Sequence, residues 1–240
     1  MSTVYQNIAI VGAGGNLGPF IIKALVAENF NVTVLSRASS QATFPASVRV
    51  LKGEYTPEFF VSTLKGQDAV VMAVSSSALA EQRAIIEAAA VAGIKRIIPS
   101  EFGSDTMNPL VVHAVPVFQG KVEIVDYLKL VSAKNPQLTW TAIINGPFFD
   151  WVRAGGSVFH AQLRTELRNN RYGPLVINGF TWYGMVKRVV VETFRQGEEN
   201  TLTPGTLLDP TQSFAIVDEG SPIRLLDCGL PDHQIARRQK

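Results

Sequence analysis

Four glycines lie close together near the start of the chain, in the stretch GAGGNLG at residues 12–18. This stretch follows an apolar run at residues 7–11, typical of a buried strand, and precedes Ile21 and Leu25 at helical spacing. At such a turn the bare backbone lets a pyrophosphate approach amide groups and the positive end of a helix dipole. A tight turn that binds nothing is the alternative. The predicted phosphate contacts are Gly12, Gly14, Gly15, Asn16, Leu17 and Gly18.

Ser36 and Arg37 follow the next apolar run, at residues 31–35. In a dinucleotide-binding fold, the end of this second strand recognises the adenosine ribose of the cofactor. An acid at this place would bind the 2′-hydroxyl of NAD, whereas a guanidinium pairs with the 2′-phosphate of NADP. Arg37 therefore favours NADP(H) as the cofactor. The alternative is that Arg37 is only a solvated loop residue.

The elements that must position these residues alternate along the chain. Apolar runs predict six strands, at residues 7–11, 31–35, 48–51, 69–74, 94–99 and 138–144. Helical patterns lie at residues 17–26, 56–66, 79–92 and 118–133. This order predicts an α/β fold, a Rossmann-type doubly wound parallel sheet with strand order 3-2-1-4-5-6 and ligands at the carboxyl ends of the strands. Later in the chain, residues 186–195 are typical of a helix, residues 203–210 of turns and residues 214–217 of a strand.

Composition narrows the possible functions. The formal net charge is only +2 and the basic residues are scattered, so we expect no nucleic-acid partner. No apolar stretch approaches the ~20 residues that span a bilayer, so we expect no membrane segment. The single cysteine, Cys228, cannot form an internal disulfide, which favours a cytoplasmic location. His160 and His233 have no metal-ligand spacing with a cysteine or an acid, and we predict no metal.

Several stretches together resemble the NmrA-like and isoflavone-reductase-like group of atypical short-chain dehydrogenases, which includes phenylcoumaran benzylic ether reductases. The matching stretches are GAGGNLG, the SR at residues 36–37, KRIIPSEFGSD at 95–105, HAVPVFQGK at 113–121 and NGPFFDW at 145–151. The resemblance covers roughly the first 150 residues. It implies an NADPH-dependent oxidoreductase that reduces a small, aromatic or carbonyl-bearing molecule. The alternative within the group is a non-catalytic NAD(P)-sensing regulator that binds a protein partner.

The resemblance also implies that Lys121 is the catalytic residue and a cofactor contact, at the start of the helix after the fifth strand. Its ammonium would bind the nicotinamide ribose and steer or donate a proton, provided that desolvation lowers its pKa. Spacing alone favours a surface lysine. Ordinary short-chain dehydrogenases use Tyr-x-x-x-Lys, but Val117 stands four residues before Lys121. The literal match at Tyr183 and Lys187 follows the sixth strand, and we interpret it as coincidence.

Weaker candidates surround these positions. The resemblance implies cofactor contacts at Ser75, Ser76 and Gln82, although the serines are equally compatible with helix capping. The predicted substrate contacts are His113, Phe148 and Phe149; an exposed histidine and core phenylalanines are the alternatives.

Two regions are expected. Residues 1–151 form the NAD(P)-binding Rossmann domain, and residues 152–240 form a small, shortened substrate-binding region. This second region matches the group poorly, and only DEGSPIRLLDCG is faintly similar to one of its segments. Three explanations fit this poor match to the group: a trimmed pocket, an altered reading of the C-terminal coding region, or a loss of catalysis.

Overall fold

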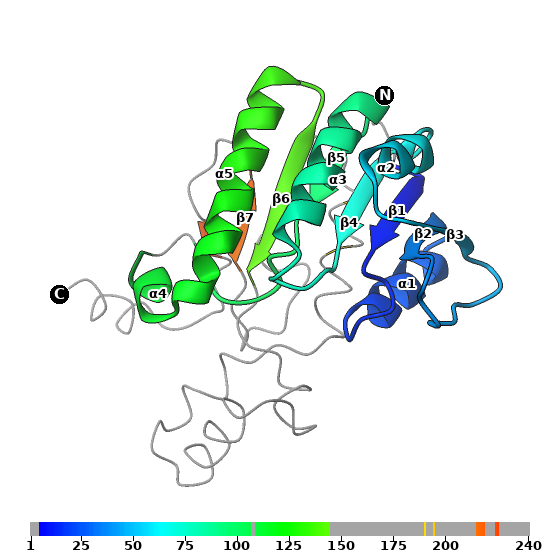
Figure 1. The fold of residues 1–240 in the computed structure, drawn as a ribbon, viewed down its shortest axis with the longest axis horizontal. Helices are drawn as coiled ribbons and strands as arrows, with labels where there is room; N and C mark the ends of the chain where they lie inside the picture. Colours follow the sequence, from blue (N-terminus) through cyan, green and yellow to red (C-terminus); the bar gives the residue numbers. More distant parts are fainter. Residues whose placement is uncertain are drawn as a thin grey trace, which may run out of the picture.

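The protein is described here by a computed structural model, which covers residues 5–106, 109–144, Val190, Phe194, 215–218 and 224–225. Eight strands form one sheet among these residues (Figure 1). They are β1 (Asn7–Val11), β2 (Asn31–Arg37), β3 (Arg49–Gly53), β4 (Ala69–Met72), β5 (Arg96–Ile98), β6 (Thr139–Ile144), β7 (Ala215–Asp218) and β8 (Arg224–Leu225).

The strands are ordered β3-β2-β1-β4-β5-β6-β7-β8 across the sheet. All pairs from β3 to β6 are parallel, whereas β7 runs antiparallel to β6 and β8 runs antiparallel to β7. The parallel part confirms the predicted order 3-2-1-4-5-6. From β1 and β4 the chain adds its later strands in opposite directions across the sheet. In this class of fold, the ligand-binding crevice lies between two such strands.

Five helices and one 3₁₀ turn connect the strands in the described part of the chain. They are α1 (Gly18–Ala27), α2 (Pro57–Leu64), α3 (Leu79–Ala92), α4 (Pro109–Ala114), η1 (Pro116–Phe118) and α5 (Gln119–Lys134). The predicted start of α2 is confirmed, because the hydroxyl of Thr56 accepts a hydrogen bond from the amide of Phe59, at 3.2 Å. Gly93 ends α3 in the left-handed conformation, with φ +78°.

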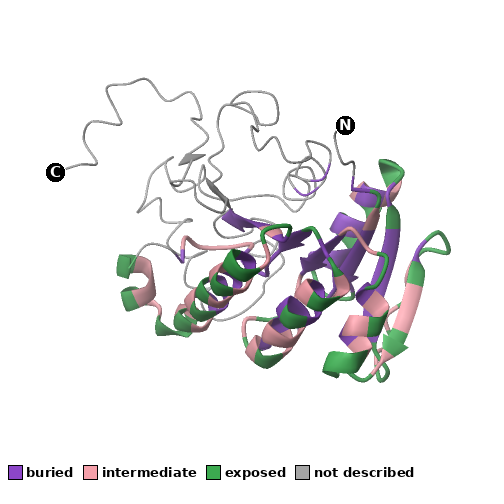
Figure 2. Ribbon diagram, turned by 90° about the horizontal axis from the view of Figure 1, so that it is seen from above, coloured by how far each residue is buried: buried purple, intermediate pink, exposed green. Residues whose placement is uncertain are grey.

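Helices cover both faces of the parallel sheet, and the strands are apolar on both sides. Ile8 and Ile10 of β1 pack into the cluster that contains the buried side chains of α1. Ala9 and Val11 point the other way, into the cluster of α2, α3 and α5. This alternation is the period of two that a strand imposes. Figure 2 shows the result, a buried sheet between helices whose outer faces are exposed.

Two residues from late in the chain complete the α1 side of the core. Val190 and Phe194 are helical, one turn apart and fully buried in the α1 cluster. The ring of Phe194 lies edge-on to Tyr5 and Phe30, with centroids 6.0 and 6.1 Å away. Val190 and Phe194 are the two residues of the helix predicted at 186–195 that the structure describes. These two side chains therefore belong to the same core as the Rossmann sheet.

Some elements differ from the prediction. The strand expected at residues 214–217 is β7, shifted by one residue, whereas β8, α4 and η1 were not predicted. Helix α4 has only six residues, too few to show a helical period in the sequence, and none of them is buried. The turns predicted at residues 203–210 and the boundary at residues 151/152 lie outside the described residues.

Candidate functional site

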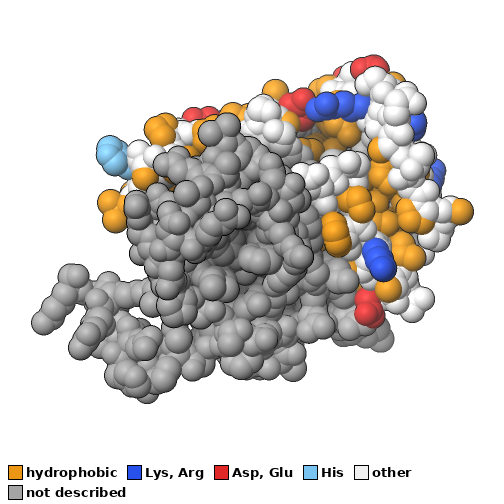
Figure 3. Space-filling model, turned by 90° about the horizontal axis from the view of Figure 1, so that it is seen from below, with side chains coloured by type: hydrophobic (Ala, Val, Ile, Leu, Met, Phe, Trp, Pro, Cys, Tyr) orange, Lys and Arg blue, Asp and Glu red, His pale blue; other side chains and the backbone are white. Residues whose placement is uncertain are grey.

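A cavity of about 400 Å³ lies at the carboxyl ends of β1, β2 and β4. Figure 3 views the molecule from the side toward which these strands run. Six predicted cofactor contacts line the cavity: Gly12, Gly14, Gly15, Ser36, Arg37 and Ser75. Its other lining residues are Ala13, Val34, Leu35, Ser39, Ser40, Ala42, Phe44, Tyr55, Ala73 and Val74. The predicted contacts Asn16, Leu17, Gly18, Ser76, Gln82 and Lys121 do not line it.

Two of the glycines are required by close backbone packing. Gly12 has φ +84°, and a Cβ there would lie 2.3 Å from the carbonyl oxygen of Ala73, just after β4. A Cβ on Gly18 would lie 2.1 Å from the carbonyl oxygen of Ala13. The contact at Gly12 packs the turn between β1 and α1 against the residue that follows β4, and the contact at Gly18 packs the start of α1 against the turn itself. The turn is therefore built by its glycines, whether or not it binds a ligand.

The other two glycines leave backbone open toward the cavity. Gly14 and Gly15 are exposed, and the amide of Gly15 donates to the carbonyl of Gly12, at 3.0 Å. No side chain in the described residues caps the start of α1, and Pro19 has no amide hydrogen to offer. The positive end of the α1 dipole therefore faces this end of the sheet without a side-chain acceptor. Such a terminus is suited to bind an anion such as a pyrophosphate.

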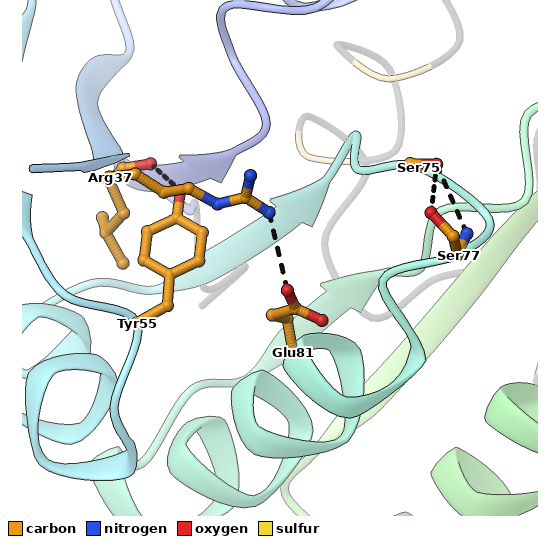
Figure 4. A network of polar contacts seen from close by, with 6 residues as sticks. Arg37, Tyr55, Ser75, Ser77 and Glu81 are labelled. Carbon is orange, nitrogen blue, oxygen red and sulfur yellow. Dashed lines mark hydrogen bonds and ion pairs between the residues drawn. The ribbon is translucent and has the colours of Figure 1, made fainter. Parts of the chain in front are cut away.

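Arg37 is the last residue of β2 and lines the cavity, and its side chain extends toward Glu81 of α3 (Figure 4). Its guanidinium carbon lies 5.4 Å from the centre of the Tyr55 ring, and its Nη2 lies 3.5 Å from a carboxylate oxygen of Glu81. The Tyr55 hydroxyl donates in turn to the carbonyl of Leu35, at 2.9 Å. Burial raises the pKa of Tyr55, so this hydroxyl remains a donor. Arg37 is thus a strand residue and not a loop residue, and its exposed guanidinium has two side-chain neighbours.

The serines after β4 form a small turn. The Ser75 and Ser77 hydroxyls are 2.9 Å apart, and the Ser77 amide donates to the Ser75 hydroxyl at 3.3 Å (Figure 4). The N-cap of α3 is Ala78, and within the described residues no side chain caps that helix. Helix capping, the alternative for these serines, is therefore not observed. Gln82 is buried inside α3 and is only 2% exposed.

Lys121 lies in the first turn of α5 and is only 8% exposed. Its ammonium donates to the backbone carbonyl of Glu101, at the carboxyl end of β5. Desolvation by burial lowers the pKa of Lys121, and the carboxylate of Glu101 partly opposes this shift. The alternative interpretation of Lys121 as a surface lysine, which spacing alone favoured, is therefore wrong.

Glu101 is a further functional candidate, and it lies in the KRIIPSEFGSD stretch that carries the family resemblance. It is 2% exposed, and its carboxylate accepts a hydrogen bond from the Thr106 hydroxyl at 2.6 Å. The adjacent Ser100 donates to the carbonyl of Val74, a cavity residue, at 2.6 Å. This bond joins the end of β5, and with it Lys121, to the wall of the cavity. The PSEFG stretch was the available signal, because it contains both Ser100 and Glu101.

His113 does not line the cavity. His113 is exposed on α4, and Phe148, Phe149, Tyr183 and Lys187 lie outside the described residues. Within the part of the chain that the structure describes, no cluster of His, Cys, Asp and Glu could hold a metal. Over the same residues, no helix combines the length and the apolar character needed to cross a bilayer.

A parallel sheet in this order, with a glycine turn at its first crossover and a cavity at its carboxyl ends, defines a Rossmann-type fold. The sequence profile of the NmrA-like family matches residues 5–149. The chain belongs to the NmrA-like family, which confirms the resemblance seen in its motifs.

Individual relatives agree with this assignment. The chain is 44% identical to the oxidoreductase aprR of Aspergillus flavus over 148 residues, covering 60% of this chain and 49% of the relative. It is 30% identical to isoflavone reductase homolog P3 of Arabidopsis thaliana over 137 residues, 52% of this chain and 44% of the relative. The solved structure of AtPrR2 with NADP+ and (+)pinoresinol superposes with a TM-score of 0.52 at 25% identity, over 61% of this chain and 52% of that one. The chain thus spans about half the length of the curated relatives that it matches.

Proposed function

We propose that this protein binds NADP(H) in the cavity and uses it to reduce a small, aromatic or carbonyl-bearing molecule. The observation that carries the proposal is that an open glycine turn and Arg37 line the same cavity. The two groups suit the two phosphate sites of NADP(H). A relative named as an oxidoreductase and a similar structure that contains NADP+ support the same assignment.

Each end of the cavity would hold one part of the cofactor. The amide of Gly14 and the start of α1 would bind the pyrophosphate, and the exposed Gly15 beside them, whose own amide bonds to Gly12, would leave room for it. Arg37 would pair with the 2′-phosphate, supported from below by the Tyr55 ring. When bound, the cofactor supplies a hydride. The protein itself must hold the substrate and manage the accompanying proton.

Lys121 is the residue best suited to that proton. Its amine is buried and its pKa is lowered, which brings its titration closer to neutral pH. Its Nζ would donate a proton to the substrate oxygen as the neighbouring carbon is reduced. Glu101 would keep Lys121 in place through its carbonyl and favour the protonated form through its carboxylate. The chemistry would then occur at the end of β5, beside the cavity wall at Val74.

The test is consumption of NADPH with a panel of quinones, phenylpropanoids and ketones, comparing the wild type with Lys121→Ala. We expect Lys121→Ala to lose turnover while it still binds NADPH. Lys129→Ala is the matched control, because Lys129 lies on the same helix and forms only an exposed ion pair with Asp126. Equal turnover in Lys121→Ala and the wild type would contradict the catalytic role.

One observation favours a second candidate, a non-catalytic NAD(P)-sensing regulator that binds a protein partner. The described cavity does not extend to Lys121, so a dinucleotide can be held without engaging that residue. A sensor of this kind would bind oxidised and reduced cofactors with comparable affinity and show no turnover with any substrate. Turnover that depends on Lys121 would rule it out.

A further inference from the structure

Arg37 is engaged by a carboxylate of the same chain. Glu81 lies 44 residues further along the chain, in the first turn of α3, and its oxygen is 3.5 Å from Nη2 of Arg37. Figure 4 shows the two side chains meeting from different elements, with the guanidinium between Glu81 and the Tyr55 ring. The same guanidinium lines the cavity, so any anion that it binds there arrives next to Glu81.

We propose that Glu81 is a specificity-determining residue, whose carboxylate competes with a 2′-phosphate for Arg37 and limits the preference for NADPH over NADH. This inference rests on the proposed function, because it requires that the cavity binds a dinucleotide. It goes beyond that function in assigning an opposing role to a second residue.

The Arg37–Glu81 pair is easily displaced. Its distance is long for a salt bridge, and the two side chains are 58% and 33% exposed, so water screens the attraction. A phosphate with nearly two negative charges and three acceptor oxygens is the stronger partner for a guanidinium. Once displaced, the Glu81 carboxylate stays close to the phosphate and repels it. NADH has no 2′-phosphate and does not meet this repulsion.

The position of Glu81 also has a purely structural explanation. An acid in the first turn of a helix is favourable because it faces the positive end of the helix dipole. That role would act on the free protein and on both complexes alike. It predicts no difference between NADPH and NADH, so measuring both cofactors separates the two explanations.

The experiment is a calorimetric titration of wild type and Glu81→Gln with NADPH and with NADH, at low salt. Glutamine keeps the size and one acceptor oxygen but removes the charge. We expect the Kd for NADPH to fall about three- to tenfold, and the Kd for NADH to stay within about twofold. Glu87→Gln is the matched control, because Glu87 is an exposed acid on the same helix that does not line the cavity. It should leave both constants within about twofold, since screening limits its reach.

Glu81→Ala provides a second variant with the same expected direction. An unchanged NADPH to NADH ratio, or weaker NADPH binding in Glu81→Gln, would overturn the inference even where the wild type binds both cofactors. If the wild type binds neither cofactor, the proposed function fails first and this inference fails with it. The two failures are therefore distinguished by the wild-type titration alone.

Discussion

Lys121 is a buried lysine whose pKa is lowered by desolvation. Lysine is among the side chains that are least often buried, because its charge is costly to remove from water. In this protein the cost is offset in part by the Glu101 carbonyl and by the nearby carboxylate, yet the pKa of Lys121 is still lowered. A residue in this state is poised to release a proton, at the expense of stability.

The pH dependence of stability tests this view of Lys121. Because burial lowers the pKa of the folded state, the unfolded chain holds the proton over a range of pH in which the folded chain has released it. Stability of the wild type should therefore rise with pH through that range and level off near the ordinary pKa of lysine. Lys121→Met removes this titration. We therefore compare the free energies of unfolding of Lys121→Met and the wild type. The value for Lys121→Met minus that for the wild type should fall by about 1.4 kcal/mol per pH unit across that range.

Urea unfolding at several pH values between neutral and alkaline measures this difference. Lys129→Met is the control, because Lys129 is exposed and its removal should give no comparable trend. A difference between Lys121→Met and the wild type that does not change with pH would contradict the account.

The sequence predicted the cavity residues that belong to local patterns and missed those that depend on distant contacts. Gly12, Gly14 and Arg37 follow from a strand, a turn and a second strand in succession. Tyr55 and Glu81 join the site only because the fold places the ends of β2, β3 and α3 side by side. No spacing in the sequence indicates that meeting.

At the scale of elements, the glycine turn is the part most constrained by geometry. A side chain at Gly12 would meet backbone rather than a movable side chain, and its φ of +84° is also unfavourable for other residues. The turn therefore tolerates substitution poorly even before ligand binding is considered.

Gly12→Ala should destabilise the protein more than Gly66→Ala does. Both glycines have positive φ, but a Cβ on Gly66 meets nothing within 4 Å. The cost of the backbone conformation, about 1–2 kcal/mol, is common to both variants, and Gly12→Ala adds the clash with Ala73. Urea unfolding gives the comparison. Equal losses of stability in the two variants would mean that the turn relaxes freely away from β4.

The sequence predicts the ends of a helix best where an apolar pattern is followed by a residue that ends helices, such as glycine. Helix α3 begins and ends at the predicted residues, with Gly93 after its last turn. Strand β2 is longer than its apolar run, because Ser36 and Arg37 continue the pairing with β3. Polar residues that extend a parallel strand give no apolar signal, which is why the prediction stopped early.

At the scale of the molecule, the late part of the chain contributes to the same core as the Rossmann sheet. Phe194 has no exposed surface and packs against Tyr5 and Phe30, two residues from the start of the chain. No periodicity in the sequence could have shown this contact, since it joins segments far apart. Phe194 therefore belongs to the same core as the start of the chain.

Phe194→Ala should lower the free energy of unfolding by about 3–5 kcal/mol, because it removes a large buried ring. Leu130→Ala is the control, since Leu130 on α5 is 63% exposed and its truncation should cost less than about 0.5 kcal/mol. Chemical denaturation measures both variants. A loss for Phe194→Ala as small as that for Leu130→Ala would show that the late segment does not support the core in solution.

The central claim is that the cavity binds NADP(H), with the glycine turn on the pyrophosphate and Arg37 on the 2′-phosphate. Its most direct test is calorimetric titration of the wild type and Arg37→Asp with NADPH and NADH. We expect one NADPH to bind per wild-type chain. We also expect Arg37→Asp to lose affinity for NADPH by a factor at least about tenfold greater than for NADH. Absence of binding to the folded wild type at millimolar cofactor, or equal losses for the two cofactors, would contradict it.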